Sequence, residues 1–338
     1  MIGLLIAAVA GCGGEQAAPR QVVLVTHDSF AVSKPVLRAF ERTSGFTLRI
    51  LQTGDAGAAL NRALLTAGTP EGDVFFGVDN NLLSRALGED LFEPYESPAL
   101  DRIDPQYVLD DEHRVTPVDH GEVCVNVDRA AFATEPAPTS FEQLALPRHR
   151  GRLVVENPAT STPGLAFLLA TIAHFGEDGW QSYWRALREN DVLVVDGWEE
   201  AYTQRFSGAG GSNGDRPIVV SYASSPPAEV IFAGKALEEA PTAVIASTCF
   251  RQVELAGVLR GARNPEGARA LLDFMLGERF QRDVPASMFV FPVREGTPLP
   301  PAFERFAVVP ERPLELPPAE IGENRDRWIG EWTDVVLR

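Results

Sequence analysis

The chain has 338 residues, of which 45% are hydrophobic and 23% are charged, and this length is typical of two domains of ordinary size. The formal net charge is −17, so the sequence lacks the basic excess of nucleic-acid-binding proteins, and we expect no nucleic-acid partner. The same acidity is compatible with a cationic ligand, although it also aids solubility.

The first twenty residues have the pattern of a secretion signal followed by a tether. The apolar run from Ile2 to Ala10 is too short to span a bilayer and fits the core of a signal peptide. Val9-Ala10-Gly11-Cys12 resembles the cleavage box of bacterial lipoproteins, whose cysteine becomes the lipidated first residue. No Lys or Arg precedes the run, and an ordinary signal with a chance cysteine is the alternative. We expect residues 1–20 to be signal and flexible tether, and the protein to be exported, periplasmic or cell-surface, and anchored to the membrane only through lipidated Cys12.

Short β-branched runs alternate with helical patterns along the rest of the chain. The predicted strands are residues 21–26, 47–53, 72–78, 114–119, 121–128, 151–158, 191–197, 216–224 and 250–259. The predicted helices are residues 33–43, 56–67, 164–175, 180–189, 265–280 and 321–337. This alternation predicts α/β domains with largely parallel sheets.

The first predicted strand is followed by His27, Asp28 and Ser29, three residue types that form hydrolytic triads. Neighbours in an extended chain point to opposite faces, so consecutive residues rarely converge on one reacting atom. We interpret the segment as a loop whose polar tip caps the next helix. A hydrolase that uses His27 or Asp28 is an alternative, but no nucleophile–base pair is recognisable, and we expect no enzyme.

Four polar clusters follow predicted strands, where α/β proteins place ligand loops. Residues 54–57 and the pair Ser161-Thr162 lie at helix starts, where free backbone N–H groups can hold an anion or a hydroxyl. Each of these two, taken alone, also fits a helix cap. The other two clusters contain Trp198 in one and Tyr222 with Ser224 in the other. A tryptophan in a loop after Asp-Gly favours a stacking surface over a core position.

Other chemistries have little support. The five histidines form no HExxH motif and there is no CxxC pair, so we expect no metal site. No glycine-rich nucleotide motif follows a strand, and we expect no cofactor. The glycine-rich insert at 207–215 is predicted to be a flexible surface loop.

Six quoted stretches carry a family resemblance: "THDSFAVSKPVLRAFERTSG", "GVDNNLL", "PATSTPGLAFLL", "GWEEAYTQRF", "SYASSPP" and "WIGEWTDVV". Together they resemble the thiamine-binding periplasmic proteins of bacterial ABC importers, in register from about Val22 to the C-terminus. The most specific pieces are "DNNLL", "TSTPGL" and the Gly-Trp-x-x-Ala-Tyr pattern, because a strand–helix rhythm alone would fit any solute-binding protein.

The resemblance implies the type II periplasmic binding protein fold, in which two α/β lobes are joined by a two-strand hinge and a ligand is enclosed between them. We expect lobe 1 to comprise residues 21–121 and about 250–300, and lobe 2 to comprise 122–249. Residues from about 301 to 338 form a C-terminal segment and helix whose lobe stays open. Cys124 and Cys249 lie on the extended hinge segments, which run side by side in this fold, so a disulfide is expected, with two separate buried thiols as the alternative.

The resemblance also implies a set of ligand-binding residues: Asp28, Ser29, Asp55, Ala56, Ser161, Thr162, Trp198, Tyr222, Ala223, Ser224, Ser225 and Phe289. This sequence departs from the family pattern at several positions, because the family has tyrosine at His27, glycine at Ala56, Thr-Thr at Ala223-Ser224 and tryptophan near Phe289. Alanine at position 56 still offers its N–H group. His27 would alter selectivity or make affinity pH-dependent.

The implied ligand is thiamine or its mono- or diphosphate, delivered by a monomer to the permease and ATPase subunits of an ABC transporter. Aromatic faces suit the thiazolium cation, and helix starts suit a phosphate. A polyamine, an aminophosphonate or another small ligand on the same fold is the alternative. A ferric-ion binder would be expected to offer adjacent tyrosines, and "SYASS" has one. A purely structural lipoprotein would not need these loops.

Overall fold

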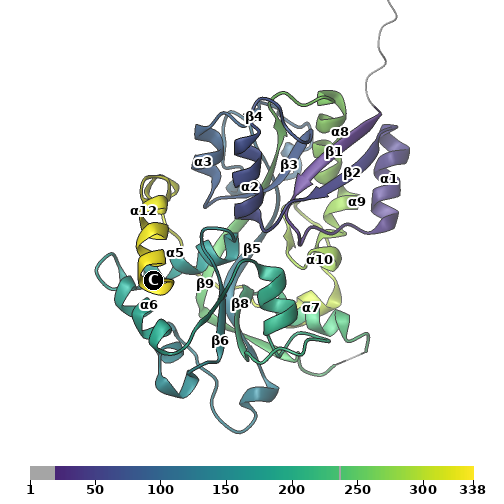
Figure 1. The fold of residues 1–338 in the computed structure, drawn as a ribbon. Helices are drawn as coiled ribbons and strands as arrows, with labels where there is room; N and C mark the ends of the chain where they lie inside the picture. The colour runs from purple at the N-terminus through teal and green to yellow at the C-terminus, as the bar shows by residue number, and fades with distance from the viewer. Residues whose placement is uncertain (1–19, 236) are drawn as a thin grey trace, which may run out of the picture.

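A computed structural model describes residues 20–235 and 237–338, which form two α/β lobes on one mixed sheet (Figure 1). The predicted signal, tether and Cys12 lie outside the described residues. The strand order is β2-β1-β3-β9-β5-β8-β6-β7, while β10 pairs with β5 and β4 pairs with β9. The strands are β1 (Gln21–Thr26), β2 (Thr47–Gln52), β3 (Val74–Asp79), β4 (Phe92–Glu93), β5 (Thr116–Asp128), β6 (Leu153–Glu156), β7 (Leu193–Val195), β8 (Ile218–Tyr222), β9 (Thr242–Leu259) and β10 (Phe291–Pro292). The α/β class is confirmed, and the two runs predicted at 114–119 and 121–128 are the single strand β5.

Lobe 1 is built on β1, which pairs in parallel with β2 and β3. Its helices are α1 (Lys34–Ser44), α2 (Ala56–Leu65), α3 (Leu83–Gly88), α8 (Pro265–Met275), α9 (Glu278–Gln281) and α10 (Val284–Ser287). Alternation along β3 sends Phe76 to the core with α1 and α8, and Phe75 to the core with α2. The single helix predicted at 265–280 is wrong, because Gly277 adopts extended backbone and separates α8 from α9.

Lobe 2 is built on β6, which pairs in parallel with β7 and β8. Its helices are α4 (Phe141–Leu144), α5 (Thr162–Phe175), α6 (Trp180–Glu189) and α7 (Ser225–Phe232). Short turns complete the two lobes: η1 (Leu100–Arg102), η2 (Pro105–Tyr107), η3 (Ala130–Phe132), η4 (Pro147–His149) and the π-helix η5 (Glu200–Arg205). Helix α5 is almost entirely buried between the sheet and α6, which explains its apolar sequence.

The C-terminal segment packs mainly on lobe 2. Helix α11 (Pro301–Phe306) contacts α7, and α12 (Pro318–Val336) contacts α6, where Trp332 meets Trp184 edge to face with ring centroids 5.5 Å apart. The yellow helix in Figure 1 lies along α6 and below α3, which it also contacts. We therefore assign residues 301–338 chiefly to lobe 2, in contact with lobe 1.

The hinge consists of β5 and β9, which pair antiparallel along most of their length and run from one lobe into the other (Figure 1). The end of β9 pairs with β3 in lobe 1, whereas Val123–Val127 of β5 pair with β8 in lobe 2. We propose the lobe boundaries at 121/122 and 249/250 because the strands exchange partners there. Cys124 and Cys249 form a disulfide that joins the two crossings.

Loss of this disulfide is expected to destabilise the protein, because the bond closes a loop of 125 residues and restricts the unfolded chain. The double variant Cys124→Ser/Cys249→Ser should lower the free energy of unfolding by about 2–4 kcal/mol, measured by denaturant titration. Cys12→Ser is the matched control and should leave it unchanged. Thiol counting in denaturant without reductant that finds Cys124 and Cys249 free would contradict the bond.

Candidate functional site

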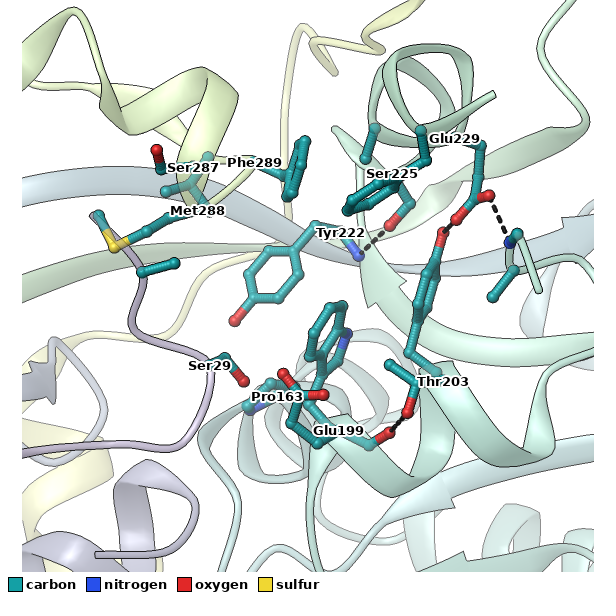
Figure 2. A pocket seen from close by; sticks show the side chains of 18 of the residues that line it. Ser29, Pro163, Glu199, Thr203, Tyr222, Ser225, Glu229, Ser287, Met288 and Phe289 are labelled. Carbon is teal, nitrogen blue, oxygen red and sulfur yellow. Dashed lines mark hydrogen bonds between the residues drawn. The ribbon is translucent and has the colours of Figure 1, made fainter. Parts of the chain in front are cut away.

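A cavity of about 830 Å³ lies between the two lobes (Figure 2). Its wall combines loops at the carboxyl ends of β1, β7 and β8 with the starts of α2, α5 and α7, and with hinge strand β9. Ligands of α/β proteins bind at this edge, because strand ends and helix starts leave polar groups free there. The position is therefore that of a ligand site shared by two lobes.

One wall of the cavity is aromatic. Trp198 stacks on Tyr202 with ring centroids 5.0 Å apart and planes at 15°, and it meets Tyr222 edge-on at 6.4 Å. The indole N–H of Trp198 donates to Ser221, whose hydroxyl contacts that of Ser225 at 2.8 Å. Figure 2 shows the ring of Tyr222 extended into the cavity with its hydroxyl directed toward Ser29. The bond to Ser221 and the stacking on Tyr202 hold the indole ring of Trp198 in a fixed orientation before any ligand arrives.

A second aromatic pair includes Phe289, which lies at the upper side of the view in Figure 2. Phe289 of lobe 1 meets Phe232 of α7 with ring centroids 4.7 Å apart, and Phe232 is exposed. Phe289 has a φ of +59°, a left-handed backbone that costs a bulky residue of the order of 1–3 kcal/mol. The hydroxyl of Ser224 donates to the Phe289 carbonyl across the lobes and holds this conformation.

Four acidic side chains line the cavity: Asp55, Glu199, Glu229 and Glu254. Among the described residues, no Lys or Arg lines it. Glu229 accepts hydrogen bonds from the hydroxyl of Tyr202 at 2.9 Å and from the N–H of Gly210 at 2.6 Å. Burial raises the pKa of Glu229, although these two hydrogen bonds act in the opposite direction. An aromatic cavity with this charge attracts a cation and disfavours an anion.

Asp55 ties the lobes together from the start of α2. Its carboxylate accepts from the N–H of Ala56 at 2.6 Å and, across the lobes, from the N–H of Trp198 at 2.9 Å and the hydroxyl of Ser161 at 3.2 Å. Burial raises its pKa to about 6, although these hydrogen bonds oppose the shift. The lobes meet closely at this point, because a Cβ atom at Gly57 would lie 2.7 Å from the carbonyl oxygen of Thr160.

The loop after β1 does not cap α1, contrary to the sequence prediction, since no side chain accepts from the start of that helix. Asp28 instead exchanges two bonds with Gly54, accepting at its carboxylate and donating from its backbone N–H, each at 3.0 Å. His27 lies against Phe76 with ring centroids 5.4 Å apart, and burial lowers its pKa to about 4. The three residues do not converge, because each has a different neighbour.

The structure brings most of the predicted ligand residues to the cavity wall: Ser29, Asp55, Ala56, Thr162, Trp198, Tyr222, Ser225 and Phe289. Four others do not line the cavity, and one of them, Asp28, is exposed. Asp28 and Ser161 bond to Gly54 and Asp55, and Ser224 bonds to Phe289. Ala223 is fully buried beside the hinge disulfide. Ser161 and Ser224 thus support wall residues through Asp55 and Phe289, and none of the four residues lines the cavity.

Several wall residues were not predicted from sequence: Glu199, Tyr202, Gly208–Gly211, Glu229 and Glu254. Tyr202 lies within a quoted motif, on the π-helix that follows Trp198, and π-helical turns frequently mark functional sites. The available signal was Gln252 and Glu254, two polar residues at period two in the second half of β9. The loop predicted at the surface for 207–215 does have exposed residues, among them Gly210 and Gly211, but it also forms part of the wall, where Gly210 bonds to Glu229.

Two further properties concern the described residues only. Within residues 20–235 and 237–338, no three His, Cys, Asp or Glu side chains are grouped so that they would hold a metal ion. In the same part of the chain, no helix combines the length and the apolar character needed to cross a membrane.

Comparison with known proteins identifies the family. The model of the bacterial extracellular solute-binding proteins matches residues 70–311. The chain belongs to this family. The thiamine-binding periplasmic protein of Escherichia coli (strain K12) is 31% identical over 321 residues, which cover 94% of each chain. That of Brucella abortus is 29% identical and covers 98% of this chain and 96% of its own. The family resemblance drawn from the sequence motifs is confirmed.

Solved structures confirm the fold class of this solute-binding protein. A periplasmic thiamin binding protein superimposes with a TM-score of 0.83 at 29% identity, over 94% of this chain and 96% of its own. Iron-bound HitA from Pseudomonas aeruginosa superimposes with a TM-score of 0.72 at 19% identity, over 94% of this chain and 99% of its own. The second likeness concerns the fold alone.

Asp55→Ala is expected to shift the ligand-free protein toward an open arrangement of the lobes. The substitution leaves the Trp198 N–H and the Ser161 hydroxyl without an acceptor while the lobes are closed, at about 1–3 kcal/mol per group, whereas opening hydrates both. Small-angle scattering should show a larger radius of gyration. Asp28→Ala removes a carboxylate that bonds within lobe 1 and is the matched control. Equal radii for the two variants would contradict the role of Asp55.

Proposed function

We propose that this protein captures thiamine in the cavity between its lobes and delivers it to an ABC importer. The observation that carries the proposal is the cavity wall, which combines three stacked or edge-on aromatic rings with four acidic side chains and, among the described residues, no lining Lys or Arg. The similarity to thiamine-binding periplasmic proteins over nearly the whole chain supports the same ligand.

The chemistry of thiamine matches this wall. Its thiazolium ring is a permanent cation, and its aminopyrimidine is flat and carries hydrogen-bonding groups. A cation over an aromatic face gains about 0.5–2 kcal/mol, and more when the contact is dry. Trp198 and Tyr222 offer such faces, and the acidic side chains elsewhere in the wall balance the positive charge of the thiazolium ring. A ligand that touches both lobes only when they are shut favours closure through this difference in affinity.

The helix starts offer less to a phosphate than the sequence indicated. At α2 the Asp55 carboxylate occupies the N–H of Ala56, so an anion would meet a negative group there. At α5 no side chain caps the helix start, but the hydroxyl of Ser161, its N-cap residue, donates to the Asp55 carboxylate. A phosphate at this helix start would therefore also meet a negative group. We therefore propose that unphosphorylated thiamine is preferred over its mono- and diphosphate.

The remaining assignments follow from this role. The protein acts without catalytic turnover and passes its ligand to the permease and ATPase subunits of the importer. It works as a monomer outside the cytoplasmic membrane and is anchored there through lipidated Cys12. Release from the membrane fraction by Cys12→Ser, with ligand binding retained, would support the anchor.

A thermal-shift series tests the ligand. Thiamine should raise the melting temperature more than its phosphates do, because binding to the folded state stabilises it in proportion to affinity. A polyamine is the second candidate, since acidic and aromatic groups also suit an oligocation, so spermidine and aminoethylphosphonate complete the series. An unchanged melting temperature in millimolar thiamine, with a shift in spermidine, would replace the thiamine proposal.

Trp198→Ala is expected to weaken thiamine binding by about 1–3 kcal/mol, because it removes a stacking face at the centre of the wall. Trp198→Phe keeps an aromatic face and should retain most of the affinity. The other four tryptophans are fully buried, so ligand-induced change in tryptophan fluorescence should come from Trp198 and disappear in both variants. Wild-type affinity in Trp198→Ala, measured by calorimetry, would exclude this wall as the site.

A further inference from the structure

Two carboxyl groups face each other on the hinge. Asp119 of β5 lies directly opposite Glu254 of β9 in the antiparallel register. The exposed fractions of the two residues are 1% and 7%, so both are more than nine-tenths buried. No N–H group or hydroxyl among the described residues donates to either carboxyl oxygen of Asp119, whose polar neighbour is the carboxyl group of Glu254. Glu254 reaches the cavity wall, and Asp119 lies behind it.

The neighbours on the cavity side add no positive charge to the pair. The Nε2 atom of His27 lies 3.6 Å from Glu254 and has no hydrogen bond within the described structure. Burial lowers the pKa of His27 to about 4, so its ring is neutral at pH 7. Asp79 of β3 and Asp55 at the start of α2 contribute further negative charge near Glu254. Tyr222 of β8 contributes a hydroxyl whose pKa is raised by burial and by these neighbouring acidic groups.

The basic side chains of the hinge, Arg251 and His120, lie on the opposite face of the two strands from the pair. Arg251 is three positions from Glu254, so its side chain points away, and it lies 3.9 Å from Glu122. His120 stacks between Tyr107 and Phe291 on that same face, and burial lowers its pKa to about 4. Neither group neutralises the pair.

Two adjacent carboxyl groups in a dry site do not both ionise, because each charge lacks water and repels the other. Burial raises the pKa of Asp119, and burial together with the charge of Asp119 raises that of Glu254 well above its usual range. At neutral pH the empty cavity therefore holds at least one proton on this pair, which titrates as a unit. A bound cation favours the ionised form instead.

We propose that Glu254, with Asp119 behind it, recognises the positive charge of the ligand by exchanging this shared proton for the cation. The inference rests on the proposed function in one respect, namely that the ligand of this cavity is a cation. The O–H bond of the carboxyl group breaks, its electron pair stays on the carboxylate oxygen, and the proton passes to a base of the buffer. In the complex the new carboxylate balances the charge of the cation. In the empty protein the carboxyl group keeps its proton, so no unpaired carboxylate is buried.

Calorimetric titration of the full chain with thiamine measures the proton directly. Binding heats at pH 7 in phosphate and in Tris, whose protonation enthalpies differ strongly, should differ by an amount that corresponds to about one proton released per thiamine. Affinity should also rise with pH, by at most about tenfold per unit, until the pair ionises without ligand.

Three variants separate recognition from proton linkage. Glu254→Gln should lose affinity by about tenfold or more and lose the buffer dependence. Asp119→Asn should keep most of the affinity and release less than the wild-type number of protons, because the charge of Asp119 no longer raises the pKa of Glu254 while the effect of burial remains. Glu122→Gln, the same change on the opposite face of β5, should behave as wild type and is the matched control.

Melting curves confirm that each variant folds, and Asp119→Asn reports on the linkage even if Glu254→Gln does not. Wild-type protein that binds thiamine with the same heat in both buffers would overturn the proposal. Wild-type affinity in Glu254→Gln would also overturn it. Failure of the wild-type chain to bind thiamine in either buffer would refute the proposed function itself, and the two failures are therefore distinguishable.

Discussion

The burial of acidic groups without basic partners is the constraint on which this cavity depends. An ionised carboxylate loses several kcal/mol of hydration in a dry site unless a charge or several hydrogen bonds replace the water. Glu229 receives two hydrogen bonds, whereas the polar neighbour of Asp119 is a second carboxyl group, that of Glu254. In our proposal the hinge pair therefore stays protonated in the empty protein, and a cationic ligand displaces a proton from it. Binding and charge compensation become one event.

The same constraint connects the site to the motion of the lobes. Asp119 and Glu254 lie on the two strands that cross between the lobes, and the disulfide of Cys124 and Cys249 fixes those strands to each other nearby. Asp55 adds a carboxylate whose hydrogen-bond donors come from both lobes. The hinge pair and Asp55 are thus acidic groups whose surroundings change when the lobes separate. Closure of the lobes is therefore coupled to charge as well as to contact area.

The sequence predicted the fold and the aromatic part of the site because both depend on local patterns. Strand–helix alternation indicated the α/β lobes, and Trp198 and Tyr222 follow strands, where side chains project toward a ligand edge. Asp119 and Glu254 were missed because their meeting depends on the register of two distant strands, which no local pattern specifies. Ser224 was placed in the wall but supports Phe289 from behind, a difference that only the backbone of Phe289 explains. The glycine-rich insert had the composition of a free loop, and its role depends on the hydrogen bond from Gly210 to Glu229.

The most direct test of the central claim is native mass spectrometry of the protein purified from its own cells without added ligand, followed by addition of thiamine. We expect a bound mass equal to thiamine, or a complete shift to the one-to-one complex when thiamine is added to ligand-free protein. A purified protein that carries a polyamine or an aminophosphonate and does not exchange it for thiamine would contradict the claim.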